Sequence, residues 1–142
     1  MREIKFDFLY YREGVWEHDI RTLEEIYNLD PIKYLLDMKL VAVRQYTGLK
    51  DKNGKEIYEE DIVKIQSKKI RYVSDEEGEG FDEVLEIDDI GVIRYNKNPF
   101  LTFVNGWVLQ TKNGCCYDHL IMDDYELEVI GNIYENSELL KG

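Results

Sequence analysis

The chain has 142 residues, of which 30 are acidic and 18 are basic, so its formal net charge is −12. This length predicts one domain, residues 1–142, with a single hydrophobic core. Direct binding to nucleic acid requires a basic face. The negative net charge therefore disfavours direct nucleic-acid binding. It is consistent with high solubility, with a basic protein partner or with imitation of DNA phosphates.

The apolar residues are too dispersed for a membrane segment. Apolar runs are only a few residues long, far below the ~20 residues that span a bilayer. Residues 1–5 contain no apolar signal core and no cleavage site, so we expect a cytoplasmic protein without membrane contacts. Cys115 and Cys116 are adjacent and such neighbours rarely pair, which excludes a disulfide framework and fits a reducing compartment.

The beginning of the chain predicts a hairpin followed by helices. Residues 4–9 alternate with period two, as in a strand, and residues 12–14 predict a turn into a return strand. Thr22 and Glu25 have the spacing of a capping box, which begins a helix. A proline after an aspartate further on suits the start of a second short helix. We therefore expect a helical insert near residues 22–39.

The middle of the chain predicts β-structure. Residues 40–46 are apolar and β-branched, which indicates a buried strand. The sequence DKNG at residues 51–54 predicts a hairpin turn, because asparagine and glycine tolerate positive φ. Residues 62–65 alternate as a further strand, which Ile70 and Tyr72 extend.

One segment, residues 74–89, has an unusual composition, with nine acidic residues and no basic one. We interpret it as a mobile solvated loop that ends in a strand near residues 84–87, because blocks of like charge usually stay solvated. The alternative is an acidic arm that binds a partner. Its contact residues would be Asp75, Glu76, Glu77 and Glu79.

Three lysines flank or lie in the DKNG turn and predict a small basic tip on this acidic protein. They are Lys50, Lys52 and Lys55. A phosphate or the acidic edge of a partner fits such a tip, and a solvated loop tip is the simpler interpretation.

The remaining strands complete a mainly β fold. Residues 91–95, 100–104, 107–111 and 125–130 each predict a strand, and Asn-Gly at 105–106 predicts a second tight hairpin. The whole pattern indicates a mainly β (α+β) protein, a small β-barrel of about seven or eight short strands with the helical insert.

No residue pattern predicts catalysis, a cofactor or a metal. The sequence CCYDH at residues 115–119 combines two thiols, a carboxylate and an imidazole. It supplies at most half of a zinc site, and the remaining ligands are not evident elsewhere in the sequence. His18, the other histidine, has no matching spacing. Carboxylate pairs such as 59–61, 88–89 and 123–124 are expected by chance among 30 acids. The eleven tyrosines are mostly strand residues that pack one face in the core.

Three blocks in order resemble the YopX family, which comprises small phage and prophage proteins, mostly of Gram-positive hosts. They are MREIKF at the start, QYTGLKDKNGKEIYEEDIV at residues 45–63 and EVIGNIYENSELL near the end. The resemblance implies a β-rich barrel with added helices in a bacterial host cell, and no established activity or cofactor. It also implies a glycine in YEGDIV where this chain has Glu60, and an Arg-Ala-Trp-Asp pattern where this chain has residues 7–10.

Three functions fit these observations. The first is a non-enzymatic accessory protein that binds another protein or associates with itself through a strand edge or an aromatic patch. The second is an acidic DNA mimic that inhibits a host DNA-binding or defence protein. The third is an enzyme with an unrecognised site.

Overall fold

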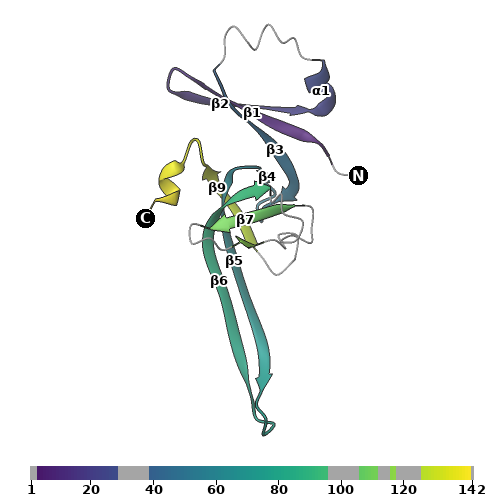
Figure 1. Cartoon of the computed structure of the whole chain (residues 1–142), viewed down its shortest axis with the longest axis vertical. Coiled ribbons are helices and arrows are strands. Elements are labelled where there is room, and N and C mark those ends of the chain that lie inside the picture. Colours follow the sequence, from purple (N-terminus) through teal and green to yellow (C-terminus); the bar gives the residue numbers. More distant parts are fainter. Residues whose placement is uncertain (1–2, 29–38, 96–105, 112–115, 118–125, 142) are drawn as a thin grey trace.

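The computed structural model describes residues 3–28, 39–95, 106–111, 116–117 and 126–141. Most of them lie in two antiparallel sheets, and the helical part is small (Figure 1). The expectation of a mainly β protein is therefore confirmed. Among these residues, no helix is long and apolar enough to cross a membrane.

The first sheet contains four strands in the order β2–β1–β3–β4. The bounds are β1 Lys5–Arg12, β2 Val15–Thr22, β3 Leu40–Lys50 and β4 Glu56–Tyr58. The expected first hairpin is confirmed, with Glu13 and Gly14 at positive φ in its turn. The DKNG hairpin is confirmed as well: it joins β3 to β4, and Gly54 has a φ of +80°.

The second sheet contains five strands in the order β8–β7–β6–β5–β9 and curls strongly. The bounds are β5 Asp61–Ser74, β6 Gly80–Tyr95, β7 Trp107–Thr111, β8 Cys116–Tyr117 and β9 Glu126–Asn132. The pairings of the described strands leave both sheets open, so the predicted closed barrel is not confirmed.

The helical elements are short. Helix α1, Leu23–Tyr27, begins with the predicted capping box: the Glu25 N–H donates to Thr22 Oγ1 at 3.3 Å, and the Thr22 N–H donates to Glu25 Oε1 at 3.2 Å. Residues 29–38 of the expected insert lie outside the described residues. A 3₁₀ turn, Ser137–Leu140, follows β9.

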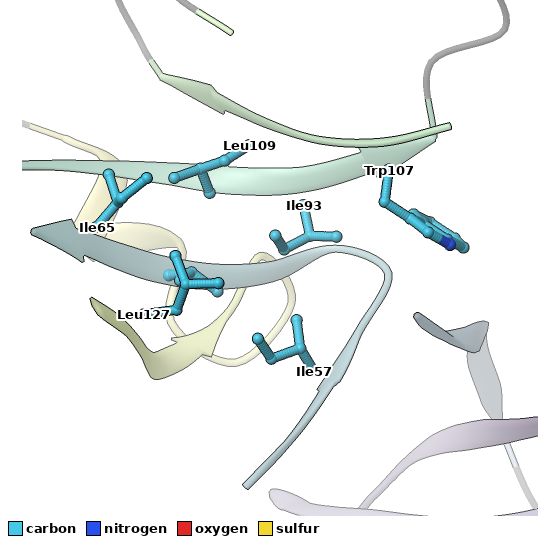
Figure 2. Close-up of a cluster of buried hydrophobic side chains, with 7 residues drawn as sticks. Ile57, Ile65, Ile93, Trp107, Leu109 and Leu127 are labelled. Atoms are coloured by element: carbon cyan, nitrogen blue, oxygen red, sulfur yellow. The ribbon is translucent and has the colours of Figure 1, made fainter. Parts of the chain in front are cut away.

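The hydrophobic core lies in the second sheet and in β4 (Figure 2). Alternate residues of β5 and β6 point toward it, as the period of a strand requires. Its buried members are Ile57, Val63, Ile65, Ile93, Trp107, Leu109 and Leu127. Strand β3 is less buried than its apolar sequence predicts, since Leu40, Val41 and Val43 are exposed and Arg44 is buried.

Strands β5 and β6 form a long hairpin that extends away from the core (Figure 1). Strand β9 pairs with β5 only at residues 61–66, and β7 pairs with β6 only at residues 91–95. From residue 67 of β5 to residue 90 of β6, the two strands pair only with each other among the described residues. We call residues 67–90 the arm.

The arm corrects one prediction. We expected residues 74–89 to be a solvated loop with a strand only near 84–87. The structure instead has a short turn over residues 75–79, and β6 begins at Gly80. Pairing with β5 explains the difference, because a hydrogen-bonded ladder along the whole segment overrides the low strand propensity of its acidic residues.

Candidate functional site

A buried ion network joins the two sheets. Arg44 of β3 donates to Asp7 of β1 through one terminal nitrogen and to Asp61 of β5 through the other, each at 2.5 Å. All three side chains are at least 94% buried. Asp61 also accepts the Tyr58 N–H at 2.8 Å, so the network fixes the junction between the sheets and the turn into β5.

His18 of β2 extends the network to Glu135, in the segment after β9. Its Nδ1 lies 2.7 Å from Asp7 Oδ2, and its Nε2 lies 2.9 Å from Glu135 Oε2. Both ring nitrogens face carboxylates, so the ring is positioned from two sides. The Asn132 side chain donates to the Glu135 carboxylate at 2.5 Å and accepts the Glu135 N–H at 2.9 Å. These two hydrogen bonds hold Glu135 in position beside His18.

An open cleft of about 500 Å³ lies over this network. Both sheets and the segment after β9 contribute to its walls. The charged residues that line it are Asp7, His18, Arg44, Lys55, Glu56, Asp61 and Glu135. Its lining therefore combines four acidic residues with two basic residues and a histidine.

Burial and charge shift the ionisation of this network. Burial lowers the pKa of Arg44, but the Asp61 and Asp7 carboxylates outweigh it, and the pKa of Arg44 is raised. Burial raises the pKa of Asp61, although Arg44 opposes that effect. Burial and the charge of Glu56 raise the pKa of Tyr58, whose ring lies beside Arg44. Arg44 is therefore a fixed cation that holds two carboxylates.

The burial of the ion network favours a structural role, in which it holds the two sheets together. Asp7 Oδ1 and Arg44 Nε have no hydrogen-bond partner among the described residues, and both atoms are fully buried. A ligand therefore cannot reach them without movement of the cleft walls. In the part of the chain that the structure describes, no group of three or more histidine, cysteine, aspartate or glutamate residues has the arrangement of a metal site.

The structure brings the predicted basic tip against β9. The Lys52 N–H donates to the Leu127 carbonyl at 2.8 Å, and Lys52 Nζ lies 3.2 Å from Glu128. Lys50 and Lys55 are exposed, and Lys55 lines the cleft. Lys52 is thus already paired with a carboxylate of the same chain.

The predicted acidic residues lie at the end of the arm. Asp75 Oδ1 accepts the Glu77 N–H at 3.0 Å and the Glu79 N–H at 2.9 Å, and Gly78 has a φ of +84°. Asp75 therefore shapes the turn, while Glu76, Glu77 and Glu79 are exposed side chains on it.

The arm also exposes large apolar side chains, which the sequence did not single out as a site. Tyr72 is 67% exposed, Phe81 60% and Val84 50%. Tyr72 lies across Gly80 of the facing strand, where a Cβ atom would collide with its ring. Exposed apolar residues on a projecting element are typical of interaction surfaces.

Glu60 occupies the position where the resemblance implies glycine. Its φ is +69°, so this glutamate adopts the left-handed conformation that glycine favours. Its carboxylate accepts the Tyr134 hydroxyl at 2.7 Å and lies 3.8 Å from Arg94. Burial, with the hydrogen bond and charge of Glu60, raises the pKa of Tyr134 to about 12.

Several predicted candidates cannot be placed. Residues 115, 118–119 and 123–124 lie outside the described residues, as does the predicted strand 100–104. Of the CCYDH sequence, residues 116–117 lie in β8. The tyrosines divide: Tyr46 and Tyr58 are buried as predicted, whereas Tyr72 and Tyr95 are more than half exposed.

Two open antiparallel sheets, a buried ion network between them and a projecting hairpin define a mainly β protein. Its sequence matches the family model described as YopX protein over residues 5–141, so the chain belongs to the YopX family. This match assigns the family without singling out YopX itself. No curated protein and no solved structure matches the chain.

Proposed function

We propose that this YopX-family chain is a non-enzymatic accessory protein of a phage or prophage, and that it binds another protein through the arm. One observation carries the proposal. Tyr72, Phe81 and Val84 are at least half exposed on a two-stranded ribbon that has no further strand beside it among the described residues. An isolated two-stranded hairpin is marginally stable in water, so an arm of this kind gains stability by burying its apolar residues in a partner.

The cleft supports a non-enzymatic role as well. Arg44 is held by two carboxylates, and both His18 nitrogens face carboxylates. A general base needs a lone pair that a substrate can reach, and each His18 ring nitrogen lies within 2.9 Å of a carboxylate of the same chain.

The charge of the arm favours a basic partner surface. Residues 67–90 contain nine acidic and three basic residues. A basic surface would meet the acids of the turn and of β6, while the aromatic residues supply buried area. Electrostatic attraction of this kind increases the association rate and weakens with salt.

The test compares three forms of the chain in affinity capture from a lysate of prophage-carrying host cells. The arm variant is Tyr72→Ser with Phe81→Ser. The control is Leu23→Ser with Tyr27→Ser, which removes two exposed apolar residues from α1 instead. We expect proteins that the wild type and the control retain and the arm variant loses. Retention of the same proteins by the arm variant, or capture of none by the wild type, contradicts the proposal.

A second candidate function, an acidic DNA mimic, is favoured by the ordered turn that carries Glu76, Glu77 and Glu79. Replacing these three by glutamine and keeping Asp75 removes charge without removing the hydrogen bonds that shape the turn. If capture depends on these three carboxylates and not on Tyr72 and Phe81, the partner recognises charge, as a DNA-binding protein would.

A further inference from the structure

The contact between His18 and Glu135 joins β2 to the segment after β9, and both residues line the cleft. The His18 side chain is 37% exposed and that of Glu135 is 24% exposed. The Asp7 side chain, on the other side of the His18 ring, is only 1% exposed. Solvent therefore reaches the His18–Glu135 end of the ion network, while the Asp7 end is closed to it.

The charge of the His18 ring decides which of its two contacts can persist. A charged imidazole donates from both nitrogens, whereas a neutral one donates from one nitrogen and accepts at the other. Ionised carboxylates only accept, so a neutral ring between two of them turns a lone pair toward one carboxylate. That lone pair costs more against buried Asp7, where no water compensates, than against Glu135, which keeps its donor Asn132. A neutral ring therefore keeps the Asp7 contact and loses the Glu135 contact.

We propose that His18 is a pH-sensitive latch between the first sheet and the segment after β9. The latch is closed when the ring is charged and open when the ring is neutral. Histidine is the side chain that ordinarily changes its charge between about pH 5 and pH 8. Opening separates two residues that line the cleft, so the latch sets the width of the cleft. This inference does not involve the arm and is independent of the proposed function.

The charged groups around the ring belong to several elements. Asp7 of β1 faces Nδ1, and Glu135 faces Nε2. On β2 itself, Glu17 and Asp19 flank His18, and the alternation of a strand places them on the opposite face. The other charged residues that line the cleft are Arg44, Lys55, Glu56 and Asp61. The two carboxylates in contact with the ring are thus the groups that its charge controls.

Glutamine at position 135 tests the latch, because its amide accepts from a charged ring and donates to a neutral one. Hydrogen exchange of the Ile133 and Tyr134 amides reports on the segment, since they donate to the Glu60 carbonyl at 3.1 Å and to Asn132 Oδ1 at 3.0 Å. At about pH 8 we expect about two- to fivefold slower exchange in Glu135→Gln than in wild type, the range that an exposed ion pair supplies. At about pH 5 the variant should exchange no more slowly than wild type. Equal rates at about pH 8, or the same slowing at both pH values, overturn the latch.

The sequence contains two histidines, which separate this contact from other effects of pH. His18→Gln removes the titrating ring, so adding Glu135→Gln to it should no longer slow the exchange at about pH 8. His119→Gln, at a position outside the described residues, is the matched control and should leave that slowing unchanged. Far-UV circular dichroism verifies the folding of each variant. Slowing that survives His18→Gln, or that His119→Gln abolishes, contradicts the assignment to His18.

Nitrogen NMR of the wild-type ring tests the latch without any substitution. At about pH 8 the remaining ring proton should be on Nδ1, toward Asp7, and Nε2 should give the signal of an unprotonated nitrogen. A proton on Nε2 would preserve the Glu135 contact and overturn the latch. A ring that keeps both protons from about pH 5 to pH 8 would overturn it as well.

Discussion

Glu60 combines a strained backbone conformation with a side-chain hydrogen bond that offsets part of the strain. A left-handed backbone costs a residue with a Cβ about 1–2 kcal/mol relative to glycine. Here the hydrogen bond from Tyr134 to the Glu60 carboxylate compensates for part of that cost. The backbone around it is held as well, since the Glu60 N–H donates to Ile93 and the Glu60 carbonyl accepts from Ile133.

Alanine and glycine at position 60 separate the two effects. Both substitutions remove the hydrogen bond to Tyr134, but only glycine relieves the backbone. We therefore expect Glu60→Gly to be more stable than Glu60→Ala by about 1 kcal/mol in urea unfolding. Equal stabilities of the two variants would show that the φ at this position carries no strain.

Asp51 is a buried carboxylate that holds a turn against the second sheet. Its oxygens accept the N–H groups of Asn53, Lys55 and Val129 at 2.9–3.0 Å. Burial raises the pKa of Asp51, but these three donors outweigh it, and the pKa is lowered. Asp51→Asn keeps one acceptor and turns the other into a donor, so at pH 7 it should lower the free energy of unfolding by about 1–3 kcal/mol.

The pH dependence of this loss follows from the direction of the shift. A carboxylate with a lowered folded-state pKa contributes its full stability above its unfolded pKa, about 3.9, and loses it as the pH falls through the folded value. The difference between wild type and Asp51→Asn should therefore be constant from pH 7 to about pH 4.5 and shrink toward pH 3. A difference that grows on acidification would show that the donors favour the neutral carboxyl.

At the scale of elements, Arg44 connects the two sheets. Arg44→Met leaves the Asp7 and Asp61 carboxylates buried without their cation, which should lower the free energy of unfolding by about 3–5 kcal/mol. Arg94→Met is the matched control, because the Arg94 side chain is 45% exposed and lies 3.8 Å from the Glu60 carboxylate. This control should stay within about 0.5 kcal/mol of wild type. Similar losses in both variants would mean that the network contributes nothing specific.

The elements that the sequence predicts well are those with local signals. The capping box at Thr22, the DKNG turn and the strand at residues 62–65 each depend on neighbouring residues, and the structure confirms all three. The expected alternation in that strand is incomplete, because Ile62 and Val63 are both fully buried. The ion network joins Arg44 to Asp7, 37 positions away, and to Asp61, 17 positions away. No spacing in the sequence predicts such contacts. Asp7 looked like an ordinary member of an alternating strand, yet it is 1% exposed.

The arm was misinterpreted for a related reason. Its acidic residues have low strand propensity, and a single segment does not show that a basic strand lies opposite. Only the register, in which β5 pairs with β6 along the whole arm, explains why residues 80–90 form a strand.

At the scale of the whole molecule, the arm and the core are separate in their contacts. The buried cluster uses β5 at Val63 and Ile65 and β6 at Ile93, all within the regions that pair with β9 or β7. Ile87 packs against that cluster from the base of the arm. The described residues beyond it contribute no member to the buried cluster.

This separation predicts that the arm can be shortened. Residues 68–86 can be replaced by Asn-Gly, because Ser67 and Ile87 are paired and a two-residue turn closes an antiparallel pair. The shortened chain should unfold cooperatively, with a free energy of unfolding within about 1 kcal/mol of wild type, since exposed surface away from the core contributes little. It should also lose the arm-dependent capture of partner proteins.

Urea unfolding followed by circular dichroism and by tryptophan fluorescence checks this prediction, because Trp107 belongs to the core cluster. Coincident transitions from the two probes indicate an intact two-state core. The control replaces residues 75–79 alone by Asn-Gly, which keeps Tyr72, Phe81 and Val84 and should keep arm-dependent capture. A shortened chain that fails to unfold cooperatively would show that the arm stabilises the core, and binding would then be a secondary role of an element that the fold requires.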